Sequence, residues 1–131
     1  NTPVVPLAEP IAKVSYPELA KPEATPLSHE MKVKLAPNEG KEIKVVMVEG
    51  DKVDYSWWTN GGRANFDVHG DSKKLNIKYH NYSKGSEEKS KGVIEAAFDG
   101  SHGWFWRNRT TKAMTIILKT SGEYTDIKQL E

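Results

Sequence analysis

The stretch Gly100-Ser101-His102-Gly103-Trp104-Phe105-Trp106-Arg107-Asn108-Arg109-Thr110 constrains the fold more than any other part of the chain. A β-strand sends successive side chains to opposite faces, so Trp104 and Trp106 share one face of such a strand. Tryptophans paired in this way are typical core anchors. We expect both rings in the core of a β-protein, which leaves the histidine and the two arginines of the stretch available for function.

The same period of two recurs along the chain from Met31 onward, in about eight short segments separated by turn residues. This spacing is typical of a β-sandwich or a β-barrel, and we expect an all-β, antiparallel β-sandwich of jelly-roll type over residues 30–131. Thr59-Asn60-Gly61-Gly62 is a strong hairpin signal. Gly70 to Gly92 is polar and predicts a long excursion with one weak strand at Leu75 to Tyr79. The other expected strands are Met31 to Leu35, Glu42 to Val48, Val53 to Trp57, Ala64 to Val68, Gly92 to Phe98, Trp104 to Asn108, Ala113 to Thr120 and Tyr124 to Leu130.

Residues 1–29 differ in character, because they hold six of the seven prolines. Proline at this density removes amide donors and disfavours both helix and sheet. The segment predicts an extended linker that spans up to roughly 85 Å in polyproline II geometry, and the alternative is a disordered tail without a role. Because the chain starts at Asn1, we expect a targeting or anchoring segment before it in the natural protein.

Bulk composition narrows the classes of function. A net charge of +1 with 28% charged residues gives no overall field for nucleic acid or an anionic membrane surface. The absence of cysteine excludes disulfides, thiolate metal sites and cysteine nucleophiles. No apolar run approaches the ~18 residues of a membrane-spanning helix.

One set of segments combines turn, apolar and aromatic strand patterns in a fixed order: Ala36 to Gly40, Ile43 to Val48, Val53 to Trp58, Gly103 to Asn108 and Lys112 to Thr120. This order of elements resembles the GOLD, or p24-like, β-sandwich. A second set consists of Asn65 to Asp71, Tyr79 to Gly85, Glu95 to Gly100 and His102 to Arg109. These segments resemble small bacterial proteins described as transmembrane anchor proteins, in which a membrane helix and a Pro/Ala-rich linker precede such a domain. The resemblance implies a periplasmic domain tethered to the bacterial inner membrane, and it implies no reaction.

Histidine is the one good transition-metal ligand available here, and three of the four histidines lie within a span of 34 residues. Imidazole with carboxylate suits zinc or copper(II), but the spacing matches no compact ligand motif, so loops would have to assemble the site. The alternative is three separate histidines with no metal. The candidate ligands are His69, His80 and His102, with Asp67, Asp71 and Asp99.

A partner-binding face is the other candidate. Trp58 points away from the core if Trp57 points into it, and Arg107 and Arg109 either pair with carboxylates such as Glu95 or Asp99 or anchor a partner. No serine lies in a nucleophile elbow, and no carboxylate pair suggests a glycosidase. The sequence therefore predicts a non-catalytic module without a cofactor that binds an envelope protein, and a histidine-based metal-binding domain is the alternative.

Overall fold

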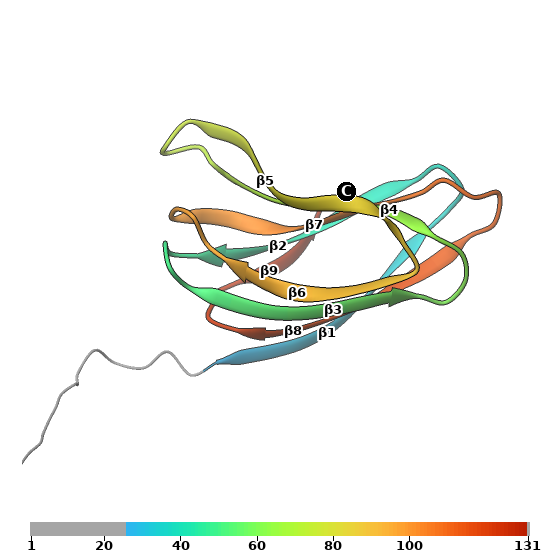
Figure 1. Cartoon of the computed structure of the whole chain (residues 1–131), viewed down its shortest axis with the longest axis horizontal. Coiled ribbons are helices and arrows are strands. Elements are labelled where there is room, and N and C mark those ends of the chain that lie inside the picture. The colour runs from blue at the N-terminus through green and yellow to red at the C-terminus, as the bar shows by residue number, and fades with distance from the viewer. Residues whose placement is uncertain (1–25, 131) are drawn as a thin grey trace, which may run out of the picture.

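The computed structural model describes residues 26–130, and in this range the chain forms nine antiparallel strands in two packed sheets (Figure 1). The predicted all-β sandwich is confirmed. The linker predicted for residues 1–29 lies outside the described residues as far as residue 25. The strands are β1 (Leu27–Leu35), β2 (Gly40–Met47), β3 (Lys52–Thr59), β4 (Ala64–Ser72), β5 (Ile77–Glu87), β6 (Lys89–Glu95), β7 (Gly100–Asn108), β8 (Met114–Gly122) and β9 (Ile127–Leu130).

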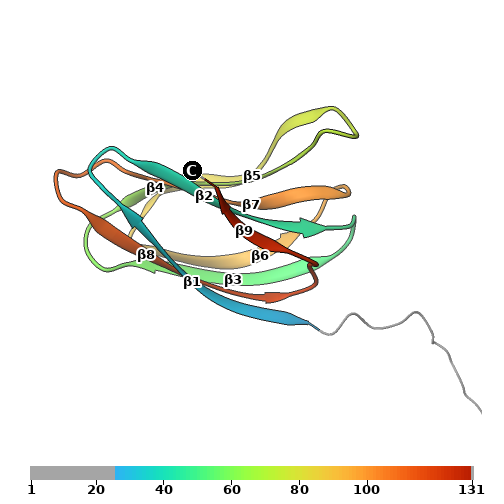
Figure 2. The same ribbon diagram turned by 180° about the vertical axis from the view of Figure 1, so that it is seen from behind.

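One sheet has four strands in the order β1-β8-β3-β6, and the other has five in the order β5-β4-β7-β2-β9 (Figure 2). The core lies between their inner faces, where residues of every strand except β5 and β9 are buried. Trp57 of the first sheet and Trp106 of the second meet edge to face, with ring centroids 6.0 Å apart. Trp57, Trp104 and Trp106 are therefore core anchors, as predicted.

These indoles are held by burial and ring packing. The indole nitrogens of Trp57, Trp104 and Trp106 have no hydrogen-bond partner among the described residues. A second ring contact, between Tyr55 and Trp104, is also edge to face, with centroids 5.4 Å apart. Such pairs add about 0.5–1.5 kcal/mol to the area that the rings bury.

The hairpin predicted at Thr59 to Gly62 is wrong, because this segment crosses from one sheet to the other. β3 pairs with β6 and β8, whereas β4 pairs with β5 and β7. Gly62 takes the positive φ of +85° that the turn needs, and Asn60 exchanges hydrogen bonds with Thr115 on β8. Turn chemistry predicted the reversal, but it could not predict which strand would accept the returning chain.

The polar stretch from Gly70 to Gly92 is also different from the prediction. It contains the end of β4, all of β5 and the start of β6, and Leu75 lies in the β4–β5 turn instead of in a strand. β5 is the outermost strand of its sheet, and most of its side chains are exposed. A strand without a buried face carries no apolar alternation, which is why the sequence pattern predicted only the first three residues of β5, within the expected strand Leu75 to Tyr79. β1 begins at Leu27, four residues before the expected start.

Candidate functional site

The outward face of the four-stranded sheet carries an apolar centre surrounded by lysines. Trp58 on β3 lies opposite Ile117 on β8 and Lys89 on β6. We call this surface the lysine face, and it consists of Trp58, Ile117, Lys32, Lys34, Lys89, Lys91 and Lys119. A sixth lysine, Lys52, and three carboxylates, those of Glu30, Asp54 and Glu95, lie on the same side of the sheet, so this side has an excess of three positive charges while the whole chain has +1.

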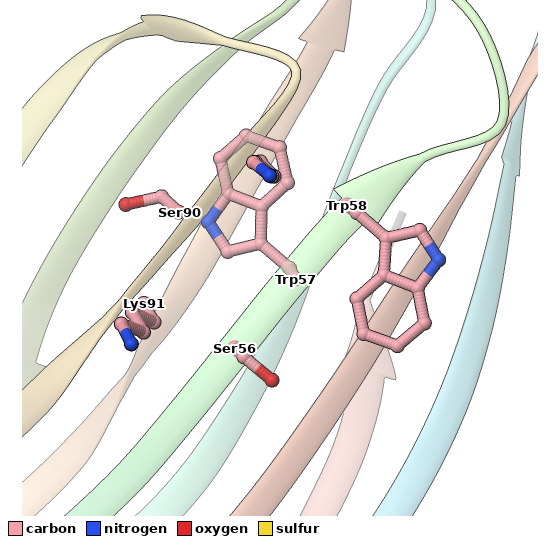
Figure 3. A pocket seen from close by; sticks show the side chains of 6 residues that line it. Ser56, Trp57, Trp58, Ser90 and Lys91 are labelled. Atoms are coloured by element: carbon pink, nitrogen blue, oxygen red, sulfur yellow. The ribbon is translucent and has the colours of Figure 1, made fainter.

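Trp58 has no packing role comparable to that of its neighbour. Its side chain is 36% exposed, whereas Trp57 is 1% exposed, and Figure 3 shows the two rings leaving β3 in different directions. The ammonium of Lys119 lies 5.8 Å from the centroid of the Trp58 ring, within cation–π range. The predicted outward position of Trp58 is therefore confirmed.

Two hollows of this sheet share Ser56 and Lys91, and the first of them also borders Trp58. The first has a volume of about 450 Å³ and reaches from Trp58 to β6, and the second has about 310 Å³ and reaches towards β1 and β8. Ser56 is small enough to leave space between its larger neighbours. The lysine face is thus indented at its centre, with a ring and ammonium groups at the border.

Arg107 and Arg109 lie on the other side of the molecule. Arg107 is on the outward face of β7 in the five-stranded sheet, and Arg109 is exposed in the loop that follows. Arg107 donates from Nη1 to the carbonyl oxygen of Asn38 at 2.7 Å, and neither arginine forms an ion pair within residues 26–130. The anticipated pairs with Glu95 or Asp99 do not form, and Trp58 and the arginines do not share one face.

His69 lies on the outward face of β4 in a hydrogen-bonded acidic cluster. Its Nε2 is 3.5 Å from Glu42 Oε2 and its Nδ1 is 3.4 Å from Asp67 Oδ1. The hydrogen bond to Glu42 raises the pKa of His69, against the opposing effects of burial and of Lys44. Asp67 in turn accepts hydrogen bonds from Tyr79 Oη at 2.7 Å and from the Asn81 amide at 2.9 Å.

His102 is buried on the inner side of β7 and belongs to a different environment. Its Nε2 donates to the Phe98 carbonyl at 2.9 Å, and its Nδ1 accepts from Tyr82 Oη at 2.9 Å. Tyr82 Oη also accepts from the Ala97 amide, so the chain of donors fixes the neutral Nε2–H tautomer. Burial lowers the pKa of His102. Gly70 is required beside it, because a Cβ there would lie 2.3 Å from Nδ1.

The six candidate metal ligands do not converge. His80 is exposed on β5, with its ring packed on Tyr82 and Phe98, on the side of the sheet opposite to His69. Asp71 pairs with the buried ammonium of Lys44, and Asp99 accepts from the Glu49 amide at 2.8 Å. Within the range that the structure describes, no three His, Asp or Glu side chains are arranged to hold a metal ion.

Sequence reasoning missed most of the lysine face. Lys32 and Lys34 were visible as an alternating pair, but Lys89 and Lys91 lay in the segment taken for an excursion. The outward position of Ile117 could not be predicted, because Ile116, Ile117 and Leu118 are consecutive apolar residues and each is a candidate for the core. The signal that was available is the alternation of lysine with small or apolar residues from Lys89 to Val93.

Comparison with known proteins adds no identity. No family model matches the chain, and no curated protein is found to be similar to it. Among the described residues, no helix is long and apolar enough to cross a membrane. The site is therefore interpreted from its own geometry.

Proposed function

We propose that this protein is a non-catalytic interaction module that docks an acidic partner protein through the lysine face. The observation that carries the proposal is Trp58, a large ring held on a rigid sheet, partly exposed, and surrounded by five lysines. Tryptophan is among the residues that contribute most at protein interfaces when a partner covers it. Lysines around such an anchor accelerate association with an acidic surface more than they tighten the complex.

The dimensions of the face favour a reversible contact. Four strands spaced about 4.8 Å apart and three rows of outward residues about 7 Å apart make a patch of roughly 15 by 15 Å between the outermost Cα positions. A stable interface buries about 800 Å² on each partner. The lysine face alone is smaller, so the complex is expected to be transient and sensitive to salt.

The setting that we propose is the periplasm of a Gram-negative bacterium, with the sandwich tethered to the inner membrane. Two sequence features support it: the proline-rich residues 1–29, and the resemblance to membrane-anchored proteins with a domain of this kind. The tether would hold the lysine face at a distance from the membrane, where an envelope protein can reach it.

Cross-linking in cells tests the proposal. A photo-reactive residue at Ser56, between Trp58 and Lys91, is expected to capture one recurrent acidic protein. Trp58→Ala and the charge reversal Lys91→Glu should each abolish capture. Lys128→Glu is the matched control, because Lys128 lies on the other sheet beside Asp126, and it should leave capture unchanged. Absence of a recurrent partner, or capture that survives Trp58→Ala, would refute the docking surface.

A further inference from the structure

The outward face of the five-stranded sheet contains a hollow of about 500 Å³ that is separate from the lysine face. Two rows of paired residues from three neighbouring strands shape it: Arg107 lies opposite Asn65, and Phe105 lies opposite Asp67, which lies opposite Lys84. This volume is in the range of small-ligand sites. The lining residues are Asn65, Phe66, Asp67, Lys84, Gly85, Phe105, Arg107 and Arg109.

Arg107 is held in place before any ligand arrives. Its guanidinium donates to the Asn38 carbonyl and lies 5.4 Å from the centroid of the Phe105 ring. Gly40 makes this arrangement possible, because a Cβ at that position would lie 2.5 Å from the Phe105 ring and 3.1 Å from Arg107 Nη2. The hydrogen bond to Asn38 uses only Nη1 of Arg107, so most N–H donors of the guanidinium stay available for a ligand.

The charges around the hollow are unbalanced. Three cations line it, namely Lys84, Arg107 and Arg109, and within residues 26–130 none of them pairs with a carboxylate. The single carboxylate of the lining, Asp67, already accepts hydrogen bonds from Tyr79 and Asn81. The hollow therefore has a positive excess of two charges, and the Phe105 ring is part of its lining.

We propose that this hollow is a binding site for an oxyanion, a phosphate or a carboxylate, carried by a ligand whose flat body lies against Phe105. Guanidinium groups recognise such anions through two parallel hydrogen bonds. Lys84 adds a point charge from the opposite strand, and the Asn65 amide adds a neutral donor. The site lies on a different sheet from the lysine face, so its occupation does not require the docking function.

Titration with phenyl phosphate tests the site, with backbone amide chemical shifts as the readout. Saturable shifts are expected at the amides of Asn65, Phe105 and Arg109. Because hydrogen bonds to charged groups contribute about 1.5–3 kcal/mol, Arg109→Gln should raise the dissociation constant at least about tenfold. Arg107→Lys keeps the charge but loses the fork, and it should weaken binding similarly.

Arg63→Gln is the matched control. Arg63 carries the same charge, but it is 3.9 Å from Glu87 and already donates to the Ser86 carbonyl, so its removal should change the dissociation constant less than about threefold. Arg109 is exposed and forms no ion pair within residues 26–130, so Arg109→Gln should leave the melting midpoint unchanged, which the same samples can verify. Equal weakening by Arg63→Gln and Arg109→Gln would show a diffuse charge effect and overturn the proposal, as would shifts that do not saturate.

Two further probes distinguish the source of the oxyanion. Inorganic phosphate lacks the flat body and should bind more weakly at the same amides. Vesicles of phosphatidylglycerol, compared with phosphatidylcholine, present the phosphate as a lipid headgroup. Co-sedimentation that Arg109→Gln abolishes would assign the site to a lipid, and binding of phenyl phosphate without co-sedimentation would assign it to a soluble ligand. If neither phenyl phosphate nor phosphatidylglycerol vesicles bind, the oxyanion site is refuted, and the docking proposal for the lysine face is unaffected.

Discussion

Asn108 at the end of β7 is expected to be one of the most sensitive positions in the domain. Its side chain is fully buried. The amide nitrogen donates to the carbonyls of Leu35 at 3.1 Å and Lys112 at 2.7 Å, and the amide oxygen accepts from the backbone and hydroxyl of Thr110 at 2.8 and 2.7 Å. One side chain thus ties the end of β1 to the connection between β7 and β8.

The magnitude follows from these four bonds. At about 0.5–1.5 kcal/mol net for each, with buried carbonyls left unpaired, Asn108→Ala should lower the free energy of unfolding by about 3–5 kcal/mol. That is a large part of a typical total of about 5–15 kcal/mol. For a domain of roughly 100 residues, about 4–8 °C are lost per kcal/mol, so the melting midpoint should fall by at least about 12 °C.

Asn108→Asp separates hydrogen bonding from packing, because it keeps the shape but removes both donors. The new carboxylate would face the two carbonyl oxygens, so we expect it to destabilise the domain at neutral pH more than alanine does. Its pKa would be raised by burial, so the deficit should shrink as the pH falls through that raised value. Urea unfolding at pH 7 and pH 5, with Asn65→Ala as the exposed control, measures both effects. A loss below about 1 kcal/mol for Asn108→Ala would refute the reasoning.

Four other outcomes are expected. Trp57→Ala should cost about 3–5 kcal/mol in urea unfolding, whereas Trp58→Ala should cost about 1 kcal/mol; equal costs would contradict the assigned faces. Burial lowers the pKa of His102, so the stability that neutral His102 contributes is complete above pH ~6.5 and is lost as the pH falls towards the lowered pKa. The free energy of unfolding of the wild type should therefore exceed that of His102→Gln by less at pH 5 than at pH 7. A difference that stays constant between these pH values would contradict the expectation. Asp71→Ala leaves the buried ammonium of Lys44 without its partner and should lower the free energy of unfolding by about 2 kcal/mol. This is less than for a fully buried pair, because Asp71 is 40% exposed. In a double-mutant cycle, the loss should vanish when Lys44 is replaced by methionine. Zinc or copper(II) should leave the melting midpoint unchanged, because the candidate histidines lie on two faces of a sheet, and a rise would restore the metal hypothesis.

Sequence periodicity predicted the strands that have one buried face. In β8 the apolar residues Met114, Ile116 and Leu118 alternate with half-buried or exposed positions, as expected. Periodicity predicted only the beginning of β5, where most side chains face solvent, and the hairpin predicted after β3 was wrong because the chain changes sheets there. Periodicity reports which face of a strand is buried, but it carries no information on which strands pair.

The candidate sites divide in the same way. Alternation along β3 was enough to place Trp58 outside, because that inference needs one strand. The prediction that Trp58 and Arg107 share one face required the relative placement of two strands, and it was wrong because β3 and β7 belong to different sheets. The two histidines His69 and His102 are also separated by the sheet. Gly70 of β4 pairs with His102 of β7, so the His102 side chain lies on the inner face, whereas His69, the residue before Gly70, points to the outward face.

By itself, the sequence determined the secondary structure class, the core positions of Trp104 and Trp106, and the outward position of single side chains. These properties depend on local backbone geometry and on the burial of apolar surface, and the alternation of apolar and polar residues along a single segment indicates both. Only the tertiary structure decided that lysines from β1, β6 and β8 surround one tryptophan, and that Lys84 lines the same hollow as Arg107 and Arg109. Strand pairing brings together residues far apart in the chain, and the free energy that selects one pairing is spread over the whole core.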